Sequence, residues 1–286
     1  MKVLIAVLVL GGIGVSVLGV GVWRYWQRFS EPAPVIESLK QIKVTFPEGW
    51  RNEEMALRLQ REGVIANWSE YTVATSSSAV APKLREQYKL SSDASLTGFL
   101  FPDTYQFVPF TEASLAVEKQ ITAFESRTAQ LELTYDTVIL ASIVEREAKF
   151  DDDRAQIAGV YANRLREGMP LQADPTVQFA KVFVTEQACL EAPPSDSLAG
   201  ACATFESIDW WPVVTRADLS AIQSPFNTYL HSGLPPEPIC NPGLASLAAA
   251  AAPAVHTFFY FVSDTEGRAH FAKTLAEHNA NVAKYR

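Results

Sequence analysis

Cysteine and histidine are scarce in this chain of 286 residues, which contains three cysteines and four histidines. Three thiols are too few for a disulfide framework, and they are one too few for an all-cysteine zinc site. The histidines form no His-Glu-x-x-His motif and no close pair; they are His231, His256, His270 and His278. We therefore expect an activity that needs neither a metal nor another cofactor.

Positive charge is also in short supply, because 24 Lys and Arg residues face 32 Asp and Glu residues and leave a net charge of −8. A nucleic-acid-binding protein should carry a basic field, so this class is disfavoured. A Gly-x-Ser-x-Gly elbow is missing too, which argues against a Ser-His-Asp hydrolase. Cys240 is the one sensible candidate for a cysteine nucleophile, and nothing around it in the sequence supports that role.

The first 29 residues predict a membrane anchor. Val3–Val22 holds only apolar residues, Gly and one Ser over 20 positions, which is the length of a helix that crosses a bilayer. A cleaved signal peptide would have a shorter apolar region followed by small residues, whereas Trp23 and Arg24 follow here. Lys2 before the span nearly balances Arg24 and Arg28 after it, so charge alone does not set the orientation.

A pair of cysteines points to an oxidising compartment. Cys189 and Cys202 flank a segment rich in Pro, Ser, Ala and Gly, and a disulfide closing that loop would account for it. Two unrelated thiols are the alternative. We predict the disulfide, with Cys240 left as a free, buried thiol, and therefore an extracytoplasmic location for the chain beyond the anchor.

The rest of the chain predicts an α+β protein with a small α/β subdomain and a larger mixed α+β domain. Residues 30–41 are a Pro-containing linker, and 42–95 begin with a short strand followed by a Pro-Glu-Gly turn and helices that start near Asn52 and Asn67. Gly63 should end the first of these helices. The aromatic segment 96–110 is either a groove lining or part of the core.

The larger domain spans residues 96–286. Its expected elements are helices at 113–130, 135–149 and 153–167, an irregular insertion at 181–209, a Pro/Gly-rich loop at 224–243, an alanine-rich helix ending at Ala252, a buried strand at 257–263, a returning strand at His270–Phe271 and a helix at 275–285. A loop as long as 224–243 in a compact domain is usually functional.

Two carboxylates follow the almost wholly apolar part of helix 135–149. Glu145 and Glu147 are two residues apart and so point about 200° away from each other, which prevents them from flanking one bond together. Glu145 has the small residues Ala141 and Ser142 on its face, whereas Glu147 is expected to pack and form an ion pair. A carboxyl group in such a place should have a raised pKa, as a general acid requires. The alternative is a pair of solvated, structural glutamates.

Several strings occur in a fixed order and together carry a family resemblance. They are Gly98–Tyr105 (GFLFPDTY), Ala141–Ala148 (ASIVEREA), Asn163–Gln172 (NRLREGMPLQ), Asp174–Thr176 (DPT), Ser224–Tyr229 (SPFNTY), Gly233–Pro236 (GLPP), Asn241–Gly243 (NPG), Tyr260–Val262 (YFV) and Glu277–Asn279 (EHN). The ordered set resembles the endolytic murein transglycosylase family, also called the YceG-like family. The resemblance begins near residue 40, includes a LysM-like subdomain at 42–95 and runs to the end of the chain.

The resemblance implies an enzyme that cleaves the β-1,4 bond between N-acetylmuramic acid and N-acetylglucosamine without water and leaves a 1,6-anhydromuramic end. It implies action outside the plasma (inner) membrane, beside peptidoglycan synthases, to end glycan elongation. The catalytic glutamate of the family matches Glu145. Candidate donors and acceptors for the sugar are Gln172, Asp174, Thr176, Asn227, Thr228, Tyr229 and His231, which could instead stabilise loops.

A single carboxyl group suffices for this reaction, because the 6-hydroxyl of the muramic sugar is an internal nucleophile. Two departures from the family pattern stand out: the insertion at 181–209 is long, and Phe226 stands where the family often has Tyr. A membrane-tethered scaffold that binds peptidoglycan without cleaving it is the alternative function. The end products of digested sacculi would separate the two.

Overall fold

The computed structural model describes residues 41–91, 94–191 and 208–286, with only the helical backbone described over 183–191. The described residues belong to one structural unit, Gln41–Arg286. None of the helices in these ranges combines the length and apolar character needed to cross a bilayer. The predicted anchor at 1–29, the linker up to residue 40 and the Cys189–Cys202 disulfide lie outside what is described.

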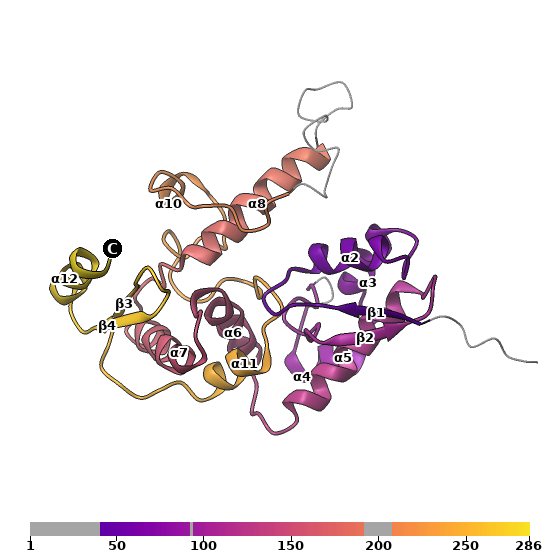
Figure 1. Ribbon diagram of the computed structural model, residues 1–286, viewed down its shortest axis with the longest axis horizontal. Coiled ribbons are helices and arrows are strands. Elements are labelled where there is room, and N and C mark those ends of the chain that lie inside the picture. Colours follow the sequence, from indigo (N-terminus) through magenta and orange to yellow (C-terminus); the bar gives the residue numbers. More distant parts are fainter. Residues whose placement is uncertain (1–40, 92–93, 192–207) are drawn as a thin grey trace, which may run out of the picture. The chain divides into compact units, whose positions relative to one another are not determined.

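The unit begins with a strand and three helices, shown in indigo and purple in Figure 1. They are β1 (Ile42–Thr45), α2 (Asn52–Arg61), α3 (Trp68–Ser76) and α4 (Pro82–Tyr88). Asn67 caps α3 as predicted, since its side chain accepts a hydrogen bond from the Ser69 N–H at 3.0 Å. Gly63, at φ +74°, ends the first helical segment as predicted. Asn52 does not cap α2; its amide turns inward and donates to Ser95 and Thr97.

The next strand returns to the first one. Strand β2 (Thr104–Phe107) pairs with β1 in antiparallel register, Ile42 opposite Phe107 and Thr45 opposite Thr104. This pairing joins the predicted subdomain to the segment after residue 95 in one sheet. The domain boundary between residues 95 and 96 stays a prediction. Phe99 and Tyr105 are buried in the shared core, so the aromatic segment belongs to the core as far as Phe107, whereas Phe110 at its end is 80% exposed. Helix α5 (Ala113–Thr128) follows.

Two helices pack against each other and against the predicted buried helix 135–149. Helix α6 (Tyr135–Glu147) is buried from Val138 through Val144, and it contacts both α7 (Asp151–Arg166) and α11 (Leu244–Ala251) (Figure 1). Thr134 caps α6, because its hydroxyl accepts a hydrogen bond from the Thr137 N–H. A helix with so few polar positions is stable only when neighbours surround it.

The predicted irregular insertion at 181–209 is partly wrong. Helix α8 runs without a break over Asp174–Glu191, so the first part of that segment is helical. The segment 192–207 lies outside the described residues. A short helix, α10 (Asp218–Ala221), contacts α8, and the loop at 224–243 contains no helix or strand, as predicted.

The chain ends in a hairpin and a helix. Strands β3 (Tyr260–Ser263) and β4 (Ala269–Ala272) pair antiparallel, and α12 (Leu275–Tyr285) packs on both. The buried strand expected at 257–263 is shorter than predicted, and Val262 is the one buried residue in that range.

One buried asparagine ties distant segments together. Asn241 has no exposed surface, and its side-chain oxygen accepts from the Gly98 N–H at 2.8 Å and the Leu100 N–H at 3.2 Å. Its amide donates to the Trp50 carbonyl at 3.1 Å and to the Asn52 side chain at 2.9 Å. The backbones of Trp50 and Asn241 also form a β-bridge. The end of the long loop is thereby fixed to the start of α2.

Candidate active site

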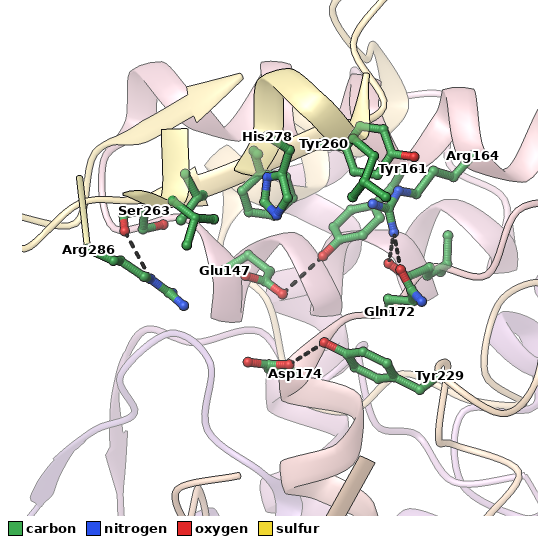
Figure 2. A pocket seen from close by; sticks show the side chains of 15 residues that line it. Glu147, Tyr161, Arg164, Gln172, Asp174, Tyr229, Tyr260, Ser263, His278 and Arg286 are labelled. Carbon is green, nitrogen blue, oxygen red and sulfur yellow. Dashed lines mark hydrogen bonds between the residues drawn. The ribbon is translucent and has the colours of Figure 1, made fainter. Parts of the chain in front are cut away.

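A cavity of about 240 Å³ opens where the C-terminal end of α6 meets α7, the start of α8 and the C-terminal hairpin. Figure 2 shows its polar side chains pointing toward a shared space. The residues that line it are Glu147, Tyr161, Arg164, Leu171, Gln172, Asp174, Tyr229, Tyr260, Phe261, Val262, Ser263, Leu275, His278, Val282 and Arg286. Two carboxyl groups, Glu147 and Asp174, therefore share one cavity although 27 positions separate them in the sequence.

Glu147 occupies the last position of α6, where the apolar helix reaches the cavity. The Tyr161 hydroxyl on α7 donates a hydrogen bond to Glu147 Oε1 at 3.0 Å. Burial raises the pKa of Glu147 to about 7, and the negative charge of Asp174 adds to this, whereas the Tyr161 hydrogen bond and the charges of Arg286 and Arg164 act in the opposite direction. A carboxyl group with this pKa is half protonated at neutral pH, which suits a general acid.

Asp174 lies at the start of α8 and is exposed to solvent. Its Oδ1 accepts a hydrogen bond from the Tyr229 hydroxyl at 2.6 Å. Burial raises the pKa of Tyr229, so this hydroxyl keeps its proton and acts as a donor. The loop 224–243 thus fixes the position of the second carboxyl group.

Gln172 faces the same cavity from a strained backbone. Its φ is +51°, in the left-handed region, and its N–H donates to the Thr228 carbonyl at 3.1 Å. Arg164 is buried and donates to the carbonyls of Phe259 at 2.7 Å and Leu171 at 2.8 Å, with Gln172 Oε1 3.5 Å away. Because Arg164 can only donate, it turns the oxygen of the Gln172 amide toward itself and leaves the NH₂ group for the cavity.

Three other predicted sugar contacts hold the loop in place instead of lining the cavity. Thr176 and Thr228 are buried and their hydroxyls hydrogen-bond to each other at 2.9 Å. Asn227 is also buried; it donates to the Leu219 and Ile222 carbonyls. His231 is exposed and is not part of the cavity lining. Direct sugar binding by these four residues stays a prediction.

Glu145 points to a different environment. Its Oε2 accepts from the Gly243 N–H at 2.9 Å, and its Oε1 lies 3.7 Å from the Arg154 guanidinium, with only 6% of the side chain exposed. Glu145 is not among the residues that line the cavity. The carboxyl group of Glu48 lies against Gly243, the residue that donates to Glu145. The prediction that the two glutamates face apart agrees with the structure, and Glu147 is the one that reaches the cavity.

The small residues next to Glu145 admit part of the protein and not a ligand. The Ser142 hydroxyl accepts from the Ile239 N–H at 3.0 Å, and the Cys240 thiol lies 3.2 Å from the Ser142 carbonyl. Cys240 is free and buried, as predicted. The close approach that Ser142 permits is used by the loop that leads into α11.

Several cavity residues were not among the sequence-based candidates. They include Tyr161, Arg164, Tyr260 and His278, none of which was proposed as a site residue. His278 stacks on Tyr260 with 5.5 Å between ring centroids, and burial lowers its pKa. Arg164, Tyr260 and His278 all lie inside the strings that carry the family resemblance, so these strings held the signal.

The family model for the YceG-like family matches residues 22–284. The chain belongs to this family. The family assignment made from the sequence is therefore confirmed. Among the described residues, no group of three or more His, Cys, Asp and Glu side chains is arranged to hold a metal ion.

This YceG-like chain has named relatives in two bacteria. It is 34% identical over 202 residues to an endolytic murein transglycosylase of Bacillus subtilis. The alignment covers 66% of this chain and 48% of that protein. It is also 28% identical over 275 residues to an endolytic murein transglycosylase of Streptococcus pneumoniae. That alignment covers 88% of this chain and 45% of the Streptococcus protein. The chain thus spans about half the length of these curated relatives.

A solved structure supports the fold of this YceG-like chain. A yceG-like protein from Listeria monocytogenes superimposes with a TM-score of 0.66 at 28% sequence identity, covering 84% of this chain and 75% of the other. The similarity therefore extends over most of both chains.

Proposed function

We propose that this chain is a lytic transglycosylase that cleaves the bond between N-acetylmuramic acid and N-acetylglucosamine in peptidoglycan and leaves 1,6-anhydromuramic ends. The observation that carries the proposal is Glu147, a carboxyl group with a pKa of about 7 in a cavity that also holds Gln172, Asp174 and Tyr229. Membership in a family whose named relatives are endolytic murein transglycosylases supports the substrate.

Glu147 can perform both proton transfers of this reaction. In its protonated form it donates to the glycosidic oxygen while the bond from that oxygen to C1 of the muramic sugar breaks. The resulting carboxylate then takes the proton of the muramic 6-hydroxyl as that oxygen bonds to C1. The acid is regenerated, no water is consumed, and the nucleophile is already part of the substrate.

The geometry favours Glu147 over Glu145 for this role. A general acid must reach the bond that it protonates, and the Glu145 carboxylate is engaged by the Gly243 N–H and by Arg154 with almost none of its surface exposed. Glu145, on α6, instead accepts a hydrogen bond from the Gly243 N–H just before α11, so its carboxylate joins the two helices.

The products formed from purified sacculi test the reaction class. We expect mass spectrometry of the digest to show 1,6-anhydromuramic ends that increase with time. New reducing ends in their place would indicate a hydrolase. A hydrolase is the strongest alternative enzyme, because glycoside hydrolases commonly use two carboxyl groups and Asp174 is a second one in the cavity. Binding to sacculi with no new ends of either kind would indicate a scaffold.

We further propose that Val3–Val22 anchors the chain in the plasma membrane, with the described residues outside the cytoplasm near peptidoglycan synthases. The apolar length of this segment supports the anchor, and a peptidoglycan substrate requires the external side. A disulfide between Cys189 and Cys202 would fit that compartment. Protease added to spheroplasts should digest the chain, and non-reducing peptide mapping should show the Cys189–Cys202 crosslink; protection from protease would contradict the orientation.

Replacing Tyr161 by phenylalanine should shift the alkaline limb of the activity profile upward. The Tyr161 hydroxyl stabilises the charged form of Glu147 and so lowers its pKa. Without it the protonated acid persists to higher pH, which a series of kcat/KM measurements between pH 5.5 and 9 would show. Tyr260→Phe, which changes another tyrosine of the same cavity, is the control and should leave the limb in place. A downward shift in Tyr161→Phe would contradict the role of Glu147 as the acid.

A further inference from the structure

The cavity contains two pairs of a carboxyl group and a tyrosine. Tyr161 donates to Glu147 at 3.0 Å and Tyr229 donates to Asp174 at 2.6 Å. Figure 2 shows the two carboxyl groups facing each other, with both tyrosine hydroxyls approaching from the same side. The pairs differ in exposure, because Glu147 is partly buried at the end of an apolar helix whereas Asp174 is exposed. Two carboxyl groups in such different surroundings commonly take different roles in glycan cleavage.

The carboxyl group of Asp174 is held in the cavity by its position on α8 and by Tyr229. It occupies the first turn of α8, a helix of 18 residues, where the positive end of the helix dipole lies. The Tyr229 hydroxyl adds a hydrogen-bond donor, and contact with water removes the cost of burying a charge. The other charged or titratable side chains of the cavity are Glu147, Arg164, Arg286, His278, Tyr161 and Tyr260. Arg164 is already engaged by backbone carbonyls.

We infer that Asp174 is a second catalytic residue, whose carboxylate stabilises the positive charge that develops on the muramic C1 and ring oxygen as the glycosidic bond breaks. This inference rests on the proposed function. Asp174 forms no covalent bond and exchanges no proton, so the transfers assigned to Glu147 remain balanced. Tyr229 is a positioning residue, because its hydroxyl holds the Asp174 carboxylate in the cavity. A charge held in advance where opposite charge develops in the transition state stabilises that state.

Binding measurements with two glycan analogues test the charge directly. One is a neutral N-acetylglucosamine tetramer, and the other is an imino sugar whose protonated ring nitrogen imitates the positive charge of the transition state. We expect Asp174→Asn to weaken binding of the cationic analogue at least about tenfold, since an opposing charge is lost. Binding of the neutral tetramer should change little, because the amide keeps the shape and the oxygen that accepts from Tyr229.

Kinetics provide the second measurement. Asp174→Asn should lower kcat by about 10²-fold with little change in KM, and Tyr229→Phe should lower kcat by a smaller factor in the same direction. Asp136→Asn is the matched control, because Asp136 is also an exposed aspartate in the first turn of a helix but lies outside the cavity lining. It should leave both constants unchanged.

The outcomes separate this inference from the proposed function. Equal weakening of both analogues in Asp174→Asn, or a raised KM with unchanged kcat, would overturn the catalytic role and make Asp174 a sugar-binding residue. Failure of the wild-type chain to bind the neutral tetramer and to release anhydro ends would overturn the proposed function, and this inference with it. Circular dichroism confirms that each variant is folded before it is compared.

Discussion

Replacing Glu147 by glutamine should lower the rate of glycan cleavage by at least about 10²-fold. The amide keeps the shape of the side chain and can still accept the hydrogen bond of Tyr161, but it cannot donate a catalytic proton. The measurement is the rate at which anhydro ends form from sacculi, normalised to the folded protein. Near-normal cleavage by a folded Glu147→Gln variant would remove Glu147 from the mechanism.

The same substitution should change how stability depends on pH. Because the pKa of Glu147 rises from 4.5 to about 7 on folding, its stabilising contribution is complete below pH 4.5 and is lost as the pH rises through 7. Glutamine does not ionise and avoids this loss. Relative to wild type, Glu147→Gln should therefore gain at most about 3 kcal/mol in free energy of unfolding between pH 4.5 and pH 8. Denaturant titrations at the two pH values would show the difference.

Glu145→Gln is the matched control for the cleavage measurement on Glu147→Gln. The change weakens a charge-assisted hydrogen bond to the Gly243 N–H and an ion pair with Arg154 that are almost fully buried. We expect a loss of stability at pH 7 with a nearly normal cleavage rate per folded molecule. The reverse pattern, with Glu145→Gln inactive and Glu147→Gln active, would restore the choice of Glu145 made from the sequence.

Replacing Asn241 by alanine should destabilise the protein by about 2 to 4 kcal/mol. The substitution leaves the Gly98 and Leu100 N–H groups without their acceptor and the Trp50 carbonyl without a side-chain donor, all in a buried place. Urea unfolding followed by tryptophan fluorescence would measure the loss. Asn279→Ala, which changes an exposed asparagine of α12, should cost less than about 0.5 kcal/mol. A cost below 1 kcal/mol for Asn241→Ala would contradict the structural role of these hydrogen bonds.

The sequence predicted those parts of the fold that local signals determine. The final helix occupies 275–285 as predicted, because the Thr274 and Glu277 capping box and the apolar spacing lie within the helix itself. Asn67 and Gly63 mark the boundaries of helices for similar reasons. The Pro, Ser, Ala and Gly content after Cys189 misled the prediction for α8, because this composition affects the segment that follows and not the helix before it.

The choice between the two glutamates could not be made from the sequence alone. Helical geometry predicts that Glu145 and Glu147 point apart, but it does not predict which one faces a neighbouring helix and which one faces a cavity. That depends on where α11 and its preceding loop pack on α6, and the contacts of Gly243 are made with a residue 98 positions away. Small residues beside a carboxylate permit close approach by a ligand or by the protein, and here the protein occupies the space.

The bridge between Trp50 and Asn241 has a consequence for the order of folding. The hydrogen bond from the Asn241 amide to the Trp50 carbonyl spans 191 positions, so the N-terminal strand and helix cannot complete their contacts until most of the chain is available. Closing so large a loop requires a substantial loss of chain entropy, and folds rich in such contacts form slowly. During synthesis, the Gly98 and Leu100 N–H groups therefore lack their buried acceptor until residue 241 emerges, although the Phe99 ring can already pack against Tyr88, Phe124 and Tyr135.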